Sequence, residues 1–190
     1  MKKIQYIVVG GSAGSFNIVT DLLSELPKDF QIPIILVLHR LKHIKSGFVE
    51  ALSTKSAVTV HEPFDKEEIV KNMVYIAPAN YHLCIEANAT FSLSIEEQVN
   101  HSRPSIDITL STAGRSLKDK VLGIVLSGAN KDGAIGLKHI KDAGGYTIVQ
   151  DPKNATVKTM PDAAIAETNP EKILSSQEII DFILNLNTKE

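Results

Sequence analysis

Short apolar runs that alternate with segments of helical periodicity are the feature that most constrains how this chain folds. The first run, residues 4–9, ends at a pair of glycines, and residues 16–26 then place apolar side chains at helical spacing before Pro27. The run has the length of one β-strand, and the periodic segment has the length of a short helix. The chain therefore begins with a strand, a tight turn and a helix.

The alternation continues to the end of the chain. Further strands are predicted at residues 32–38, 58–60, 73–77, 83–95, 121–126 and 146–149, and further helices at 46–53, 104–117, 134–142 and 178–186. The segments between 58 and 95 are expected to leave the main sheet as an excursion that contains a hairpin. Strands that alternate with helices form a largely parallel sheet through right-handed crossovers. The predicted fold is α/β: a doubly wound, mostly parallel sheet with helices on both faces, Rossmann-like in its three α/β/α layers, plus a small antiparallel hairpin.

Length and charge narrow the functional classes. The chain has 190 residues, 43% of them hydrophobic, so residues 1–190 are expected to form one domain with a sizeable core. The net charge of -2 comes from scattered residues, without the basic stripe that nucleic-acid binding requires. No apolar run approaches the roughly 20 residues of a membrane span, and the first is too short for a signal peptide. With Cys84 as the single cysteine, we expect a cytoplasmic protein without membrane insertion.

Three predicted strands end in residues that carry chemistry. The first runs into the turn GGSAG at 10–14, whose small residues expose the hydroxyl of Ser12 in front of a helix N-terminus. The second strand ends at His39, and the strand at 121–126 is followed by a loop that contains Asp132. Because the carboxyl ends of parallel strands meet at one edge of the sheet, these side chains are expected to lie together. They predict a serine nucleophile, a histidine general base and an orienting acid.

The same residues, with further motifs, resemble one protein family. The motifs are VVGGSAG at 8–14, the strand-terminal His39, YIAP at 75–78, RPSID at 103–107, LSGANKDGA at 126–134 and MP at 160–161. In this order they resemble the catalytic domain of the chemotaxis protein-glutamate methylesterases, the CheB family, over almost the whole chain. The resemblance implies a doubly wound domain that hydrolyses glutamate methyl esters on chemoreceptors and releases methanol. In some members such a domain also deamidates glutamine.

The resemblance also implies roles for individual residues. Ser12 would be the nucleophile, His39 the base and Asp132 the acid, in agreement with the assignment from the residues alone. Backbone N–H groups near Ala13 and Ala129 would bind the oxyanion. The implied partners are the methylated cytoplasmic helices of chemoreceptors and a separate receiver domain.

Two arginines are candidate substrate-binding residues. Arg40 and Arg103 either fix loops or recognise an acidic receptor segment. The remaining histidines lack the spacing of a metal site and are interpreted as surface or loop residues: His43, His61, His82, His101 and His139. We therefore predict neither a metal nor another cofactor.

Several positions depart from the usual family pattern. Ala13 stands where Thr is usual, Ser15 where Gly is usual, Ser102 where many members have His, and Ala129 where Met is common. Full-length members also carry an N-terminal receiver domain, whereas this sequence begins at its first catalytic strand, so regulation by phosphorylation in cis is not expected.

Two other functions stay open on the sequence. The turn at 8–14 resembles a dinucleotide-binding turn, and Arg40 could face a 2′-phosphate, as in a nucleotide-binding oxidoreductase; the G-x-G-x-x-G spacing is not met, however. A catalytically silent domain that docks on chemoreceptors or a signalling partner would fit the departures at Ala13, Ser15 and Ser102. The presence of all three triad residues favours an active hydrolase.

Overall fold

The computed structural model describes residues 3–39 and 47–186. The strands are β1 (Tyr6–Gly11), β2 (Ile34–Leu38), β3 (Thr59–His61), β4 (Met73–Ile76), β5 (His82–Ile85), β6 (Phe91–Ser94), β7 (Val121–Val125), β8 (Tyr146–Gln150) and β9 (Lys172–Leu174). The helices are α1 (Phe16–Glu25), α2 (Phe48–Ser53), α3 (Ile106–Leu117), α4 (Ala134–Asp142), α5 (Thr159–Thr168) and α6 (Ser176–Leu184), with a 3-10 turn η1 (Lys118–Lys120).

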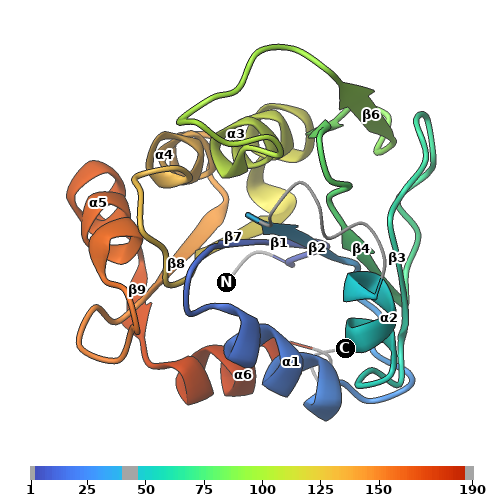
Figure 1. Ribbon diagram of the computed structural model, residues 1–190, viewed down its shortest axis with the longest axis horizontal. Helices are drawn as coiled ribbons and strands as arrows, with labels where there is room; N and C mark the ends of the chain where they lie inside the picture. The colour runs from blue at the N-terminus through green and yellow to red at the C-terminus, as the bar shows by residue number, and fades with distance from the viewer. Residues whose placement is uncertain (1–2, 40–46, 187–190) are drawn as a thin grey trace.

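Seven of the strands in the described part of the chain form one parallel sheet. Their order is β3-β4-β2-β1-β7-β8-β9, and β5 and β6 form a separate antiparallel pair. Helices α1, α2 and α6 cover one face, and α3, α4 and α5 cover the other, with the β5–β6 hairpin beside α3 (Figure 1). The predicted doubly wound α/β fold with a small hairpin is confirmed.

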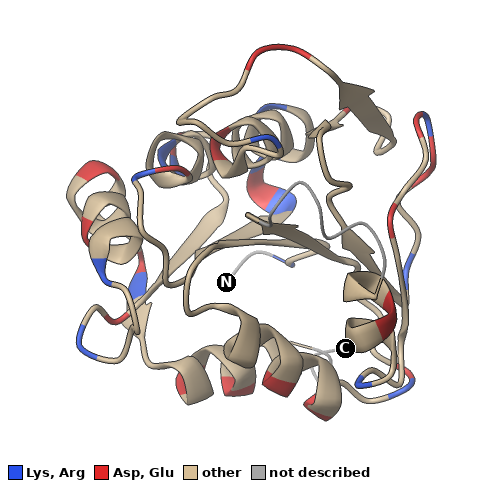
Figure 2. Cartoon of the chain, in the orientation of Figure 1, with Lys and Arg blue, Asp and Glu red and all other residues tan. Residues whose placement is uncertain are grey.

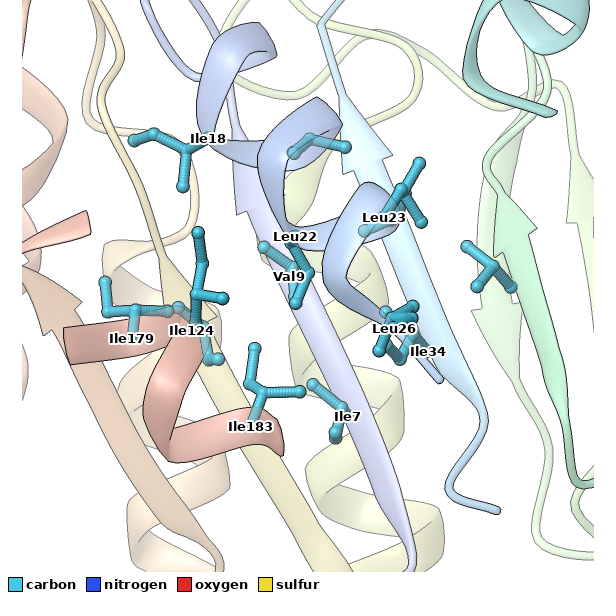
Figure 3. Close-up of a cluster of buried hydrophobic side chains, with 14 of the residues drawn as sticks. Ile7, Val9, Ile18, Leu22, Leu23, Leu26, Ile34, Ile124, Ile179 and Ile183 are labelled. Carbon is cyan, nitrogen blue, oxygen red and sulfur yellow. The ribbon is translucent and has the colours of Figure 1, made fainter. Parts of the chain in front are cut away.

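Both faces of the central strands are buried. In β1, Ile7 and Val9 pack into the core under α1 and α6, whereas Val8 packs into the core under α3 and α4. Figure 3 shows Ile7 and Val9 beside Leu22 of α1 and Ile183 of α6. A strand covered on both faces needs apolar side chains at every position, which explains the continuous apolar runs in the sequence.

Charged residues lie outside these two cores. Figure 2 shows Lys, Arg, Asp and Glu on the helices and connecting loops, and β1, β2 and β7 contain none. No helix in the described ranges combines the length and the apolar character that a membrane crossing needs.

Two expectations about the elements were wrong or incomplete. Residues 58–60 and 73–77 were expected in an excursion, but β3 and β4 belong to the main sheet, where β4 pairs with β2; only β5 and β6 form the hairpin. Elements α5 and β9 had no predicted counterpart. The apolar residues of α5 do not gather on one face, and β9 has only three residues, so local periodicity marks neither element.

The strand order places a topological switch point at β1. The chain leaves β1 for β2 on one side, and β7 later pairs with β1 on the other side. The carboxyl ends of β2, β1 and β7 are therefore neighbours, as expected of a binding edge in an open α/β sheet.

Candidate active site

Ser12 lies directly after β1, in a turn that is held by hydrogen bonds of the Ser12 backbone. Its N–H donates to the carbonyl of Ser127 (2.9 Å), and its carbonyl accepts from the N–H (3.0 Å) and the hydroxyl (2.7 Å) of Ser15. Helix α1 begins at Phe16 with Ser15 as its N-cap residue, so Ser12 is not the cap. The half-buried Ser12 hydroxyl makes no hydrogen bond to any residue in the described ranges, which leaves it available for chemistry.

Glycines allow this turn to close. Gly14 has a φ of 84°, a left-handed conformation, whereas Ser12 does not have a positive φ. A Cβ atom at Gly10 would lie only 2.2 Å from Cγ2 of Ile106 in α3. The bend therefore falls on Gly14, and the close approach of α3 requires a glycine at position 10.

His39 and Asp132 are in direct contact. His39 follows β2, and its backbone N–H donates to the carbonyl of Gly11 (3.1 Å) at the end of β1. Its Nε2 lies 2.8 Å from Oδ2 of Asp132, in the loop after β7. Ser12 lies at the adjoining strand end, because Gly11 pairs with Leu38, but no hydrogen bond joins its side chain to His39.

The carboxylate of Asp132 is fully buried and accepts hydrogen bonds on both oxygens. Besides His39, the donors are the Ile106 N–H (2.7 Å to Oδ2), the Ser105 hydroxyl (2.8 Å to Oδ1), the Asp107 N–H (3.1 Å to Oδ1) and the Asn100 side-chain amide (3.1 Å to Oδ1). Burial raises the pKa of Asp132, but the hydrogen bonds, above all that from His39, outweigh it and lower the pKa below its usual value. Asp132 is therefore ionised at neutral pH, and Nε2–H of His39 donates to it.

The second ring nitrogen of His39 is then the basic atom. With the hydrogen on Nε2, the neutral ring carries its lone pair on Nδ1. The hydroxyl of Ser102 lies 3.4 Å from Nδ1. His39 thus contacts an acid through one nitrogen and a hydroxyl through the other.

Three polar residues around Asp132 had no role in the sequence-based assignment. Ser105 is the N-cap of α3, and a serine near the start of the predicted helix at 104–117 is the one signal that could have revealed it. Asp107 accepts hydrogen bonds from the N–H groups of Gly133 (2.9 Å) and Gly136 (2.8 Å). Burial raises the pKa of Asp107, and the nearby charge of Asp132 raises it further. The third residue is Asn100, which has no sequence signal.

The two expected oxyanion donors lie in turns that Ser127 joins. The Ser127 hydroxyl donates to the carbonyl of Ala13 (2.7 Å), and its N–H donates to Oε1 of the buried Gln150 (2.8 Å). Ala13 and Ala129 are exposed, and neither N–H donates to a residue in the described part of the chain. Both N–H groups are therefore available to a carbonyl oxygen.

Arg103 fixes a loop and also lines a cavity. Its Nη1 donates to the carbonyls of Ile95 (2.6 Å) and Glu96 (2.8 Å), and its Nε is buried without a partner among the described residues. The cavity, of about 620 Å³, is also lined by Ile95, Tyr81 and Glu62. Arg103 follows Ser102 in the chain, but Ser12, His39 and Asp132 are not among the residues that line this cavity. Arg40 and His43 lie outside the described residues.

The interpretation of His82 as a surface or loop residue was wrong. His82 is fully buried on β5, where its Nδ1 accepts from the N–H of Ser105 (3.2 Å) and its Nε2 donates to the carbonyl of Glu97 (2.9 Å). Two backbone partners satisfy the ring, which removes the cost of burying it. Within residues 3–39 and 47–186, no group of three or more His, Cys, Asp or Glu side chains is placed to hold a metal ion.

Comparisons with known proteins identify the family and the fold of the chain. The CheB methylesterase family matches residues 7–183. A Thermotoga maritima protein-glutamate methylesterase/protein-glutamine glutaminase is 32% identical over 187 residues, which cover 95% of this chain and 53% of that protein. A Leptospira interrogans protein, which bears the same name provisionally, is 44% identical over 181 residues, covering 95% of this chain and 94% of that protein.

A solved structure gives the same result. The crystal structure of the Thermotoga maritima CheB methylesterase catalytic domain matches with a TM-score of 0.90 at 32% identity, over 96% of this chain and 98% of that one. The chain spans nearly the whole Leptospira protein but only about half of the Thermotoga one. These matches give no support to the oxidoreductase alternative. They confirm the resemblance seen in the sequence: the chain belongs to the CheB methylesterase family and has the fold of its catalytic domain.

Proposed function

We propose that this chain is a serine hydrolase that removes methyl esters from glutamate side chains of proteins and releases methanol. The observation that carries the proposal is the contact of His39 with the buried carboxylate of Asp132, at the strand end that adjoins Ser12. Relatives named for methylesterase and glutaminase activity support the choice of substrate bond.

The first half of the reaction would form an acyl-enzyme. Ser12 Oγ attacks the ester carbonyl carbon while its proton passes to His39 Nδ1, and the carbonyl electron pair moves onto oxygen. The N–H groups of Ala13 and Ala129 then hold that oxygen. The electron pair on that oxygen then re-forms the carbonyl as the bond to the methoxy oxygen breaks, and the proton moves from Nδ1 to the methoxy oxygen, which leaves as methanol. Asp132 keeps its negative charge throughout and stabilises the imidazolium.

The second half would return the enzyme to its starting state. Water attacks the acyl carbon and gives a proton to Nδ1, and the carbon–Oγ bond breaks as that proton returns to Ser12. The product is a glutamate carboxylate. When the substrate is a glutamine side chain, the same steps release ammonia in place of methanol and also leave glutamate.

The methylated cytoplasmic helices of chemoreceptors are the substrate that we propose. Arg103, held by two carbonyls, supplies a positive charge for an acidic receptor segment. The side chains of Tyr81 and Ile95, which are 41% and 73% exposed, supply apolar contacts in the same cavity. In this proposal residues 1–190 act as one catalytic domain in the cytoplasm, and a separate receiver domain is a partner.

Methanol release from radiolabelled, methylated chemoreceptor membranes tests the proposal. Wild type and Ser24→Ala, which alters an exposed hydroxyl on α1, are expected to release methanol, whereas Ser12→Ala is expected to release almost none. A fluorophosphonate should label Ser12 in wild type, and peptide mapping identifies the labelled residue. No methanol release by wild type would contradict the proposed substrate, and full activity of Ser12→Ala would contradict the nucleophile.

A further inference from the structure

A closed turn at residues 99–102 stands beside the candidate active site. Val99 and Ser102 exchange two backbone hydrogen bonds, of 3.2 Å and 2.9 Å. Asn100 and His101 between them have φ values of 50° and 62°, so the chain reverses direction within two residues. The turn therefore holds Ser102 in a defined place by its own backbone.

The turn contacts both the acid and the base of the site. The side-chain amide of Asn100 donates to Asp132 (3.1 Å) and to Asp107 (2.8 Å). Two residues further on, the oxygen of Ser102 lies 3.4 Å from Nδ1 of His39 and 3.4 Å from the carbonyl oxygen of Asn100. One hydroxyl thus has a ring nitrogen and a carbonyl as alternative partners.

We propose that Ser102 is a positioning residue that hydrogen-bonds the basic nitrogen of His39 in both of its protonation states. In the resting site, the lone pair of Nδ1 accepts the hydroxyl hydrogen of Ser102. For Nδ1 to take up the proton of Ser12, the hydroxyl hydrogen of Ser102 turns to the carbonyl of Asn100 and frees that lone pair, and the new N–H of the ring then donates to the oxygen of Ser102. A serine can serve both states because its hydroxyl is donor and acceptor and its hydrogen rotates.

The two hydrogen bonds differ in strength. The bond to the protonated ring is charge-assisted, and such bonds are shorter and stronger than those between neutral groups. The contact of 3.4 Å is long, as is common in sites without substrate, and is expected to tighten when the ring is charged. Ser102 therefore stabilises the imidazolium more than the neutral ring, and it makes His39 a better base. Its role in ester hydrolysis rests on the proposed function, whereas the hydrogen bond itself does not.

Other charged and titratable side chains near His39 also influence its protonation. Asp132 is in direct contact with the ring, and Asp107 is linked to Asp132 through Asn100. His101 and Arg103 flank Ser102 in the chain, and the guanidinium of Arg103 is engaged with carbonyls of the neighbouring loop. Removal of the Ser102 hydroxyl leaves all of these groups in place, so a change in the protonation of His39 reports on that hydroxyl.

The direct measurement is an NMR titration of the His39 ring nitrogens in wild type, Ser102→Ala, Ser102→Thr and the control Ser24→Ala. In Ser102→Ala the midpoint should fall by about one pH unit, because a hydrogen bond to a charged group is lost. Ser102→Thr, which keeps the hydroxyl, should restore the wild-type midpoint, and Ser24→Ala should not change it. An unchanged midpoint in Ser102→Ala would overturn the inference.

The kinetic readout separates this inference from the proposed function. In Ser102→Ala, kcat for methanol release should fall about tenfold with KM unchanged, and the acid limb of the pH–rate profile should move to lower pH. If wild type releases no methanol but the NMR midpoint still shifts, the proposed substrate fails and the inference stands. If wild type releases methanol but the His39 midpoint does not change in Ser102→Ala, the proposed substrate stands and the inference about Ser102 fails. A fluorophosphonate adduct on Ser102 instead of Ser12 would overturn the positioning role, because Ser102 would then be the nucleophile.

Discussion

Asp132 accepts hydrogen bonds from the start of α3, the helix that contains Asp107, and Asp107 accepts hydrogen bonds from the start of α4, the helix that follows Asp132. Asp132, two residues before α4, accepts the N–H groups of Ile106 and Asp107 at the start of α3. Asp107, in the first turn of α3, accepts the N–H groups of Gly133 and Gly136 at the start of α4. The positive ends of two helices thus face two buried carboxylates, and their hydrogen bonds help to outweigh the cost of burial at Asp132 but offset it only in part at Asp107. The packing of α3 against α4 is therefore what places the acid of the site.

This arrangement predicts how Asp132→Asn changes stability with pH. The pKa of Asp132 is lowered in the folded state, so its ionisation stabilises the fold at neutral pH, and this contribution is lost as pH falls through the folded pKa. At pH 7 the variant should lose about 3 kcal/mol of unfolding free energy, because it leaves buried N–H donors badly paired. The difference from wild type should shrink below about pH 4. Urea unfolding at both pH values checks this; an equal difference at both would contradict it.

Asp107→Asn should show the opposite trend. Burial and the charge of Asp132 raise the pKa of Asp107, so its ionisation costs stability. That cost is absent below the unfolded-state pKa of about 4 and grows as pH rises through the folded pKa. The stability of the variant relative to wild type should therefore improve from acid to neutral pH. Unfolding free energies measured across this range, beside those of Asp132→Asn, test the sign; a parallel trend in the two variants would refute it.

Arg103→Ala is expected to weaken substrate binding more than chemistry. The substitution removes a positive charge from the cavity and two hydrogen bonds that hold the loop at Ile95 and Glu96. KM for methylated receptor should rise about tenfold, with a smaller change in kcat, because the guanidinium does not touch the reacting atoms. Arg115→Ala, an exposed arginine at the end of α3, is the matched control. Equal effects of the two substitutions would argue against a substrate contact.

Gly10→Ala should destabilise the fold through α3. Its Cβ would lie 2.2 Å from Cγ2 of Ile106, so α3 must shift or the side chain must leave its rotamer, at a cost of about 1–3 kcal/mol. The double variant Gly10→Ala/Ile106→Ala lacks the clashing Ile106 side chain. Its loss of unfolding free energy should therefore be smaller than the sum of the losses in the two single variants. Thermal unfolding of the four proteins measures this coupling, and strict additivity would show that the clash is not the cause.

Much of the fold follows from local patterns in the chain. The helix at 134–142 has the bounds that periodicity predicts, and the strands that precede Ser12 and His39 follow from apolar runs closed by small or polar residues. In contrast, α5 and β9 carry little pattern of their own. They form because the edge of the sheet and the face beside α4 offer them hydrogen bonds and apolar surface.

The candidate site likewise has residues that the sequence predicts and contacts that only the structure shows. Ser12, His39 and Asp132 can be named from the sequence, since strand ends in a parallel sheet converge and these residue types suit acyl transfer. Only the tertiary structure shows that Asp132 contacts Nε2 of His39 and that the hydroxyl of Ser102 lies near Nδ1. These contacts join segments up to 93 residues apart in sequence. Residue periodicity encodes which face of an element is buried, whereas the partner of a buried polar atom depends on the packing of elements distant in the chain, which no local pattern records.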